Sequence, residues 1–361
     1  MESLLYPIIF YRSFKIFKHV EINYIMQIQA YAAHQRAGKL EPFEYDLGPL
    51  KSDEVEVDVE YCSICHSDLH MLDNEWGITQ YPFVPGHEII GRVSAIGNMV
   101  DHLQIGQYVG VGWRARSCLI CDQCTSGHHN LCLKAEDVIV GRYGGFANKV
   151  RCQAVWAFPL STNIDIKTAG PLFCGGITVF NPIVQNNIKP PNHVAVVGIG
   201  GLGHLAIKFL KAWGCEVTAF SSNPEKENEV KQFGAHYFLN SKDPNSLKSS
   251  VNRFDMVLVT TNFELDWNSY LSTLRPGGKL HIVGAIPSVK VDVFPLISGE
   301  KSIGGSPIGS PATITTMLDF CSRHGITPVT EEFPLSRVNE ALAHLKAGKA
   351  RYRIVLRNDL K

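Results

Sequence analysis

The first half of the chain contains short segments whose hydrophobic pattern is typical of β-strands. Residues 55–61, VEVDVEY, alternate apolar and polar side chains with a period of two, which is typical of a half-buried strand in an antiparallel sheet. Two similar segments, 91–97 and 106–113, are bounded by glycine and proline residues that favour turns. The first ~170 residues are therefore predicted to form a β-rich domain with irregular loops.

The hydrophobic pattern changes after Pro190 and Pro191. Residues 194–198, VAVVG, are a continuous apolar run, as expected for a strand that is buried on both faces of a sheet, and apolar residues at helical spacing follow. Further strand-like runs, which alternate with helical patterns, occur at 216–220, 256–261 and 280–286. This alternation predicts an α/β fold with a doubly wound parallel sheet, in which ligands bind at the carboxyl ends of the strands.

We expect two domains in the 361 residues, at roughly 150 residues per domain. The N-terminal segment is aromatic and mildly basic, but Glu2 and the scattered lysines argue against a secretory signal, so this segment is expected to precede the first domain. The C-terminal segment is expected to return to the first domain. The predicted limits are 1–25 for the extension, 26–173 with 312–361 for the first domain, and 174–311 for a nucleotide-binding domain.

Composition and charge exclude several classes of function. The 34 basic and 34 acidic residues give a formal net charge of +0, which provides no electrostatic attraction toward nucleic acid or an anionic membrane. No apolar run reaches the ~20 residues of a membrane-spanning helix. Because no secretory signal is recognisable, we expect a cytoplasmic protein, in which thiols stay reduced and clustered cysteines bind metal more often than they form disulfides.

Four of the ten cysteines lie close together in the pattern C-x2-C-x2-C-x7-C. Four thiolates on one short loop suit zinc, which binds four soft ligands in tetrahedral geometry and stabilises a segment with little hydrophobic core. Disulfide bonds are the alternative, and the expected compartment disfavours them. A site closed by four sulfurs has no open position, so we expect a structural zinc held by Cys118, Cys121, Cys124 and Cys132.

A second group of possible metal ligands is scattered along the chain. Residues 62–70, CSICHSDLH, contain two cysteines and two histidines, and the tripeptide GHE follows at 86–88. Cys174 lies much later, in the segment GPLFCGGITVF. Catalytic zinc sites use three protein ligands and leave the fourth position to water or substrate. None of these segments is specific alone, but together they indicate a catalytic metal site.

Several motifs occur in one order along the chain: C-x-x-C-H-S-D-x-H, V-P-G-H-E, the four-cysteine loop, P-L-x-C-G-G-I-T-V, G-x-G-G-x-G-H, G-S-x-I-G-S and a terminal R-Y-R. From about Met26 onward the chain therefore resembles the zinc-dependent medium-chain alcohol dehydrogenase family, and most closely its cinnamyl-alcohol-dehydrogenase-like branch. The resemblance implies a GroES-like β-rich catalytic domain and a Rossmann domain. It also implies a homo-oligomer, either a dimer or a tetramer, for which the edge strand around Ile303 is a candidate interface.

The resemblance implies that Cys65, His87 and Cys174 are the catalytic zinc ligands. Asp68 would hold the ring of His87 through its far nitrogen, as metal-binding histidines generally require. Glu88 would lie near the zinc, and an equally open interpretation is that it is a buried charge partner.

The resemblance also implies a path for the substrate proton. Ser67 would hydrogen-bond the oxygen of the substrate alcohol, and His70 would end the path at the solvent. Zinc is a Lewis acid that lowers the pKa of a bound alcohol, which favours release of hydride to a nicotinamide. A serine can only pass a proton along, so a histidine, which titrates near neutral pH, suits the end of the path.

The segment VAVVGIGGLGHLAIKFL carries a dinucleotide-binding pattern. Gly198, Gly200 and Gly203 form G-x-G-x-x-G between a predicted strand and a predicted helix, where glycines permit a tight turn, close approach of the pyrophosphate and close packing of helix on strand. The resemblance adds further expected cofactor contacts, namely Thr178, Gly201, Leu202 and Ser306.

The end of the second predicted strand of this domain indicates which cofactor is preferred. Enzymes that use NAD carry an acidic residue here, but this chain has Ser221 and Ser222 followed by Lys226, which suit the 2′-phosphate of NADP. An alternative interpretation is that the two serines cap a helix that begins near Pro224. The two roles are compatible, and the resemblance favours NADP(H).

The substrate is expected to be a primary alcohol or its aldehyde, with Trp76, Trp113 and Ile308 as candidate pocket residues. The segment 133–143 has no tryptophan, unlike the plant cinnamyl enzymes, so a broad-specificity aldehyde reductase is expected. One alternative is an NAD-dependent polyol dehydrogenase, which generally has glutamate in place of Cys174. Another is a zinc-binding nucleotide sensor without activity, which would hold one zinc.

Overall fold

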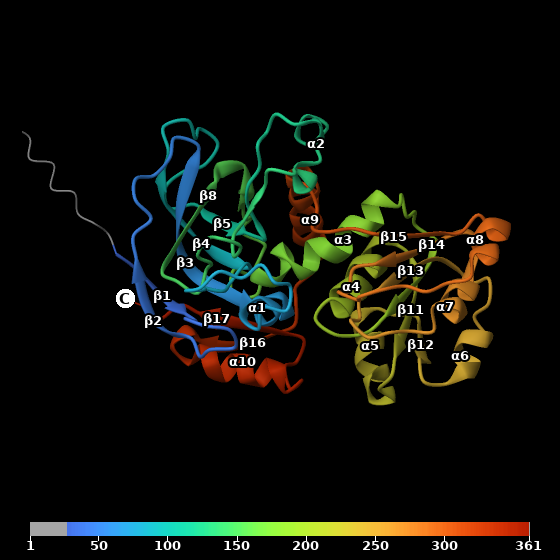
Figure 1. The fold of residues 1–361 in the computed structure, drawn as a ribbon. Coiled ribbons are helices and arrows are strands. Elements are labelled where there is room, and N and C mark those ends of the chain that lie inside the picture. Colours follow the sequence, from blue (N-terminus) through green and yellow to red (C-terminus); the bar gives the residue numbers. More distant parts are fainter. Residues whose placement is uncertain (1–26, 361) are drawn as a thin grey trace, which may run out of the picture.

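The computed structural model describes residues 27–360, so the predicted extension 1–25 lies outside the described residues. Two lobes are built around two separate sheets, with the β-rich lobe on the left of Figure 1 and the lobe that contains the parallel sheet on the right. The predicted fold class, a β-rich domain joined to a doubly wound parallel sheet, is confirmed.

The first lobe contains a seven-stranded sheet in the order β16-β17-β3-β4-β5-β9, with β8 also paired to β3. Its strands are β3 (Glu54–Ile64), β4 (Ile89–Ile96), β5 (Tyr108–Val111), β8 (Lys149–Gln153), β9 (Ala157–Pro159), β16 (Thr330–Pro334) and β17 (Arg353–Arg357). Two-stranded sheets add β1 (Ile28–Ala32) with β2 (Glu41–Tyr45), and β6 (Arg114–Arg116) with β7 (Glu136–Asp137). The last strand therefore returns to the first sheet, where β17 pairs with β3 in antiparallel orientation.

The segment that was predicted to be a half-buried strand differs from this expectation. In β3 the acidic side chains of Glu54 and Glu56 are buried, with 4% and 5% of their surface exposed. Arg116 pairs with Glu54 at 3.2 Å, and Arg151 pairs with Glu56 at 2.7 Å. A buried carboxylate needs such a partner, so alternation of polarity along this strand does not separate a buried face from a solvent face.

The second lobe contains a six-stranded parallel sheet in the order β12-β11-β10-β13-β14-β15. Its strands are β10 (His193–Val197), β11 (Glu216–Ser221), β12 (Tyr237–Asn240), β13 (Phe254–Val259), β14 (Leu274–Ile282) and β15 (Ser302–Gly305). Four of the five residues of β10 are buried, as its continuous apolar run predicts, because helices cover both faces of the sheet.

Helices connect these strands and join the lobes (Figure 1). They are α1 (His66–Leu72), α2 (Asp122–Thr125), α3 (Gly175–Gln185), α4 (Gly203–Trp213), α5 (Glu227–Phe233), α6 (Pro244–Lys248), α7 (Trp267–Thr273), α8 (Val293–Gly299), α9 (Pro311–His324) and α10 (Val338–Lys346). Short 3-10 turns lie at His129–Leu131, Ala154–Trp156, Gly170–Phe173, Pro224–Lys226 and Leu335–Arg337. One hydrophobic cluster contains Ile90 and Trp156 of the first lobe together with Phe180 and Phe209 of α3 and α4, so the two lobes share a core.

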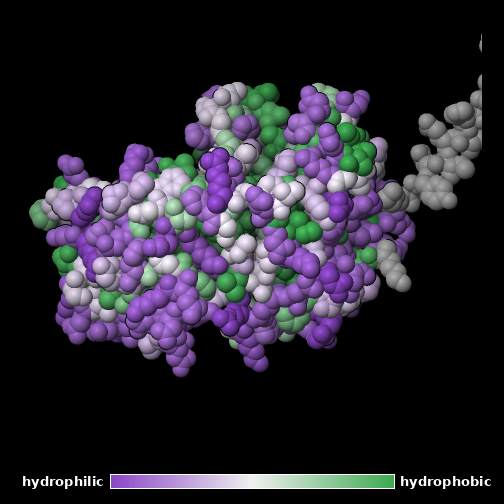
Figure 2. All heavy atoms as spheres, turned by 180° about the vertical axis from the view of Figure 1, so that it is seen from behind, coloured by the Kyte–Doolittle hydropathy of each residue, from purple (hydrophilic) through white to green (hydrophobic). Residues whose placement is uncertain are grey.

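The surface seen from behind is mostly polar, with apolar residues in small scattered patches (Figure 2). Within residues 27–360, no helix combines the length and the apolar character that crossing a membrane requires.

Candidate functional site

A cavity of about 810 Å³ is lined by residues from both lobes. At one end are side chains of α1 and Cys65, the residue before it, together with Cys174 and Thr178 at the start of α3. At the other end are the glycine-rich loop after β10 and the residues that follow β11 and β13. This arrangement places most of the predicted catalytic and cofactor residues around one space, although His87, Gly203 and Ser306 are not part of the lining.

Four possible metal ligands converge at the first end of the cavity. One ligand atom from each of Cys65, His87, Glu88 and Cys174 lies within 4.8 Å of all the others. The sulfurs of Cys65 and Cys174 are 3.8 Å apart. The hydrogen bond between these thiols holds the pKa of Cys65 well below its usual range and that of Cys174 well above it, so Cys65 is the more readily deprotonated of the two.

Asp68 fixes the orientation of the His87 ring. Both side chains are fully buried, and Nδ1 of His87 donates to Oδ1 of Asp68 at 3.0 Å. The same carboxylate accepts from the backbone N–H groups of Cys65 at 2.8 Å and Gly86 at 2.9 Å. The Nε2 atom of His87 is left without a partner among residues 27–360. A buried imidazole with one nitrogen held by a carboxylate and the other free has the arrangement that a metal ligand requires.

Glu88 fits both interpretations that the sequence leaves open, a position near the zinc and a role as a buried charge partner. Its Oε1 atom accepts from the guanidinium of Arg353, while Oε2 is buried with no partner in the described part of the chain. Burial raises the pKa of Glu88, and the charge of Arg353 opposes this effect. Two cysteines, a histidine and a nearby carboxylate are a donor set that suits zinc, so the residues fit a catalytic zinc ion.

The four-cysteine loop forms a second, separate group. The sulfurs of Cys118, Cys121, Cys124 and Cys132 all lie within 4.8 Å of one another, and all ten cysteines are free thiols. Backbone N–H groups of Ile120 and Cys121 lower the pKa of Cys118 to about 6, which favours the thiolate. Four convergent sulfurs fit a tetrahedral structural zinc and leave no position for substrate.

Ser67 and His70 both line the cavity from α1. The hydroxyl of Ser67 lies 3.7 Å from the sulfur of Cys65, and Nδ1 of His70 is 2.5 Å from Oε2 of Glu75. We did not predict Glu75 from the sequence. The available signal was an acidic residue five positions after the expected relay histidine. The turn at the end of α1 brings the two residues together, because the backbone N–H of Glu75 donates to the carbonyl oxygen of His70 at 2.9 Å.

The three candidate substrate-pocket residues have different positions. Trp76 lines the cavity and stacks on His70 with ring centres 5.4 Å apart. Trp113 lies against the His87 ring at 4.9 Å and against Trp76 at 6.1 Å, but it is not part of the lining of the cavity. Ile308 is instead buried in the shared core and is absent from the lining of this cavity, so the structure does not support the expectation that it lines the pocket.

The glycine-rich loop after β10 lines the cavity with its backbone. Gly198, Gly200, Gly201 and Leu202 line it, and a Cβ atom at Gly200 would meet nothing within 4 Å, which leaves room for a ligand to approach the backbone. A Cβ atom at Gly203 would lie 2.0 Å from the carbonyl oxygen of Gly198, so only glycine permits this packing of α4 on β10.

Ser306, like Gly203, is an expected cofactor contact that is absent from the lining of the cavity. Its hydroxyl lies 3.0 Å from Nε2 of His281, and it does not contribute to the lining.

The residues after β11 form the far corner of the cavity. Ser221, Ser222, Asn223 and Lys226 line it. The cap of the turn that begins at Pro224 is Asn223, whose side chain accepts from the N–H of Glu225 at 3.0 Å. The alternative interpretation, in which the two serines cap this turn, is therefore wrong, since the asparagine already supplies the acceptor.

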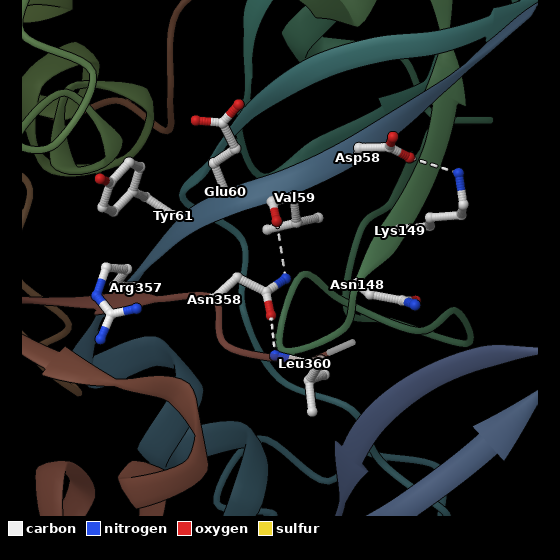
Figure 3. Close-up of a pocket in the computed structure, with 9 residues that line it drawn as sticks. All are labelled: Asp58, Val59, Glu60, Tyr61, Asn148, Lys149, Arg357, Asn358 and Leu360. Carbon is white, nitrogen blue, oxygen red and sulfur yellow. Dashed lines mark hydrogen bonds and ion pairs between the residues drawn. The ribbon is translucent and has the colours of Figure 1, made fainter.

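A smaller hollow of about 470 Å³ lies on the first sheet beside the end of β17 (Figure 3). Its polar groups pair with one another: Lys149 with Asp58, and the side chain of Asn358 with the carbonyl oxygen of Val59 at 2.8 Å. The lining of this hollow contains none of the predicted site residues. The 810 Å³ cavity is therefore the candidate active site.

Comparison with known proteins agrees with this geometry. Residues 51–162 match the family described as the alcohol dehydrogenase GroES-like domain, and residues 201–323 match the family described as zinc-binding dehydrogenase. The chain belongs to the zinc-dependent medium-chain alcohol dehydrogenase family. The predicted family of this dehydrogenase is thereby confirmed, as is its assignment as an oxidoreductase.

Individual relatives place the dehydrogenase within its family. It is 54% identical over 330 residues to aldehyde reductase AdhA of Synechocystis sp., covering 91% of this chain and 98% of that protein. A cinnamyl alcohol dehydrogenase from Sorghum bicolor has a similar structure, with a TM-score of 0.87, 34% identity and coverage of 92% and 97%. The structure of a CAD from Helicobacter pylori in complex with NADP(H) gives a TM-score of 0.84 at 29% identity, with coverage of 92% and 98%.

Proposed function

We propose that this dehydrogenase transfers hydride between NADP(H) and a primary alcohol or aldehyde, as an aldehyde reductase of broad specificity. The observation that carries this proposal is the single cavity that joins the Cys65 and Cys174 group to the corner at Ser221, Ser222 and Lys226. The relatives support it, because one is named an aldehyde reductase and another was solved with NADP(H).

The zinc sites follow from the two convergent ligand groups. We propose that Cys65, His87 and Cys174 hold a catalytic zinc with Glu88 close by, and that the four-cysteine loop holds a structural zinc. A zinc ion at the first site supplies Lewis acidity at the substrate oxygen. Asp68 keeps His87 in the tautomer that leaves Nε2 free for this role.

The chain's own residues provide a path for the substrate proton. Ser67 lies beside Cys65, where its hydroxyl can hydrogen-bond a substrate oxygen. His70 lines the same cavity, and its Nε2 atom has no partner within residues 27–360, so it is able to exchange a proton there. The carboxylate of Glu75 holds Nδ1 of this ring and fixes its orientation.

The cofactor corner supports NADP over NAD. Ser221 and Ser222 provide hydroxyls, Lys226 provides a positive charge, and β11 ends without the carboxylate that would bind the free ribose of NAD. Gly198, Gly200, Gly201, Leu202 and Thr178 are proposed to contact the remainder of the cofactor.

The proposal is tested by reduction of an aromatic aldehyde with NADPH and with NADH. We expect kcat/KM to be at least about tenfold higher with NADPH, because the 2′-phosphate adds a charge-assisted contact. Lys226→Met should remove most of that difference. Equal efficiency with the two cofactors would overturn the proposed preference, and absence of turnover with both would overturn the proposed reaction.

The wider setting of the enzyme is part of the proposal. We propose residues 26–173 with 312–361 as the catalytic domain and 174–311 as the cofactor domain. A homo-oligomer is supported by β15, which is an edge strand that contains Ile303, and by the exposed apolar side chains of Phe294 and Ile297 on the adjacent α8. A cytoplasmic location is supported by the reduced thiols that the two zinc groups require.

A further inference from the structure

Three consecutive residues near the end of the chain connect the proposed zinc site to the cofactor lobe. Arg353 binds Glu88 beside the proposed catalytic zinc. The two residues before it reach the cofactor lobe: the guanidinium of Arg351 donates to Oε1 of Glu229 at 2.7 Å, and the hydroxyl of Tyr352 donates to Oε2 at 2.5 Å. Both oxygens of the Glu229 carboxylate are therefore engaged by the first lobe.

Tyr352 is held firmly in this position. Its ring packs against His204 of α4 at 4.7 Å and against Phe233 of α5 at 5.2 Å, and the residue is 9% exposed. Its backbone has a φ of 69°, in the left-handed region that residues with side chains rarely adopt. Such a conformation persists only where surrounding contacts enforce it, and in folded proteins it is concentrated at functional positions.

Glu229 follows Lys226 by three residues, across the join between the 3-10 turn and α5. At this spacing on a helical surface, a glutamate and a lysine are close enough to form an ion pair. Instead, the ammonium of Lys226 donates to the carbonyl oxygen of Ile199 at 2.7 Å and lies 5.4 Å above the ring of Tyr352. No carboxylate of residues 27–360 forms an ion pair with Lys226.

The charges around Lys226 are consistent with this separation. Burial lowers the pKa of Lys226, whereas the charge of Glu229 raises it, so the two groups interact without direct contact. The other nearby acid of α5, Glu227, pairs with Lys231 at 2.7 Å on the exposed side of the helix. Glu229 is thus the acidic group best placed to compete with a phosphate for Lys226.

We infer that Arg351 and Tyr352 are positioning residues for cofactor specificity: they hold the carboxylate of Glu229 away from Lys226, which leaves the ammonium available to the 2′-phosphate of NADP(H). This inference rests on the proposed preference for NADP(H). It assigns a role to the first two residues of the R-Y-R motif, and it makes cofactor choice depend on a contact between the two lobes.

The experiment measures dissociation constants for NADPH and NADH by fluorescence titration of the zinc-loaded, full-length protein. Three variants free the carboxylate of Glu229: the single variants Arg351→Met and Tyr352→Phe, and the double variant that combines them. We expect the double variant to weaken NADPH binding about fivefold, which is the size of effect that one ion pair near the surface has on a dissociation constant. NADH binding should change less than about twofold, because NADH has no 2′-phosphate. Adding Glu229→Gln to the double variant should restore NADPH binding, because the competing charge is gone.

The matched control is Glu227→Gln, which removes a carboxylate of the same helix that pairs elsewhere and should leave both dissociation constants unchanged. The Arg351 side chain is 69% exposed, so Arg351→Met tests the inference even if Tyr352→Phe does not fold. Parallel weakening of NADPH and NADH, or no recovery with Glu229→Gln, would overturn the inference. The wild-type ratio of the two constants tests the proposed cofactor preference separately, because the inference concerns only how that ratio changes.

Discussion

Nδ1 of His87 lies 3.0 Å from Oδ1 of Asp68, and both side chains are fully buried. This contact decides which nitrogen of the ring faces the other proposed zinc ligands, because a proton on Nδ1 leaves the lone pair on Nε2. The same carboxylate also accepts two backbone N–H groups, from Cys65 and Gly86. Asp68 therefore orders three parts of the site at once: the ring of His87, the start of α1 and the turn before His87.

The first prediction concerns Asp68. Asp68→Asn replaces a carboxylate with an amide, which supports the ring less strongly and turns a donor group toward some of its N–H partners. We expect zinc affinity or kcat/KM to fall about 10- to 100-fold, which is typical when the support of a metal ligand is lost. Zinc retained after dialysis against a chelator and kcat/KM are measured together. Wild-type values for both would contradict the positioning role.

The second prediction concerns the proton path. His70→Ala should slow turnover about 100-fold and alter the pH dependence of kcat, because it removes the group that exchanges the proton with solvent. Glu75→Gln keeps a hydrogen-bonding partner of similar shape at Nδ1, so we expect a smaller loss. Steady-state kinetics across pH provide the measurement. An unchanged pH profile in His70→Ala would rule out this residue as the end of the path.

The third prediction separates the two zinc groups. Wild-type protein should contain about two zinc ions per chain, and both Cys174→Ser and Cys121→Ser should reduce this to about one. Cys174→Ser should abolish activity with little loss of stability, whereas Cys121→Ser should lower the unfolding midpoint, since structural zinc stabilises the loop that binds it. Elemental analysis and urea unfolding check both outcomes. A wild-type content of one zinc would contradict the two-site proposal.

The fourth prediction concerns the pH dependence of stability. Burial lowers the pKa of His204 from 6.5 to about 3, and its neutral ring lies 3.1 Å from the carbonyl oxygen of Gly200 and accepts from the N–H of Val329 at 3.2 Å. Between these two pH values the unfolded state binds a proton that the folded state rejects. The contribution of His204 is thus complete above pH 6.5 and is lost as the pH falls toward 3.

At pH 5 this linkage destabilises the folded state by about 2 kcal/mol relative to pH 8. His204→Gln should therefore lose less stability between pH 8 and pH 5 than wild type does, as measured by urea unfolding of the zinc-loaded protein. His102→Gln, at a side chain that is 53% exposed, is the matched control. Equal losses in wild type and in His204→Gln would show that this histidine does not set the pH dependence.

The overall fold was predictable because its signals are local. The continuous apolar run at 194–198 and the glycines that follow it indicate a buried strand and a cofactor loop without reference to any distant residue. The four-cysteine loop is equally local, and its sulfurs converge as expected.

The features that sequence reasoning missed depend on partners far along the chain. The burial of Glu56 in β3 is compatible with its charge because Lys149 and Arg151 of the neighbouring strand β8 both pair with it. The contact between the hydroxyl of Ser306 and the ring of His281 joins positions 25 residues apart, and no local pattern indicates it. The pairing of Tyr352 with Glu229 joins positions 123 residues apart, so no local pattern reveals it.

The position of β17 has a consequence for how the molecule is made. Its partner β3 emerges from the ribosome some 300 residues earlier, so residues 61–64 of β3 lack their partner on one side until β17 has been synthesised. The cofactor lobe lies between them in the sequence, and its strands pair in parallel with one another, so it is able to fold while the chain is still growing. The proposed ligands Cys65 and His87 are translated early, but Glu88 gains its partner Arg353 only at the end of synthesis. Assembly of the catalytic centre is therefore among the last steps of folding.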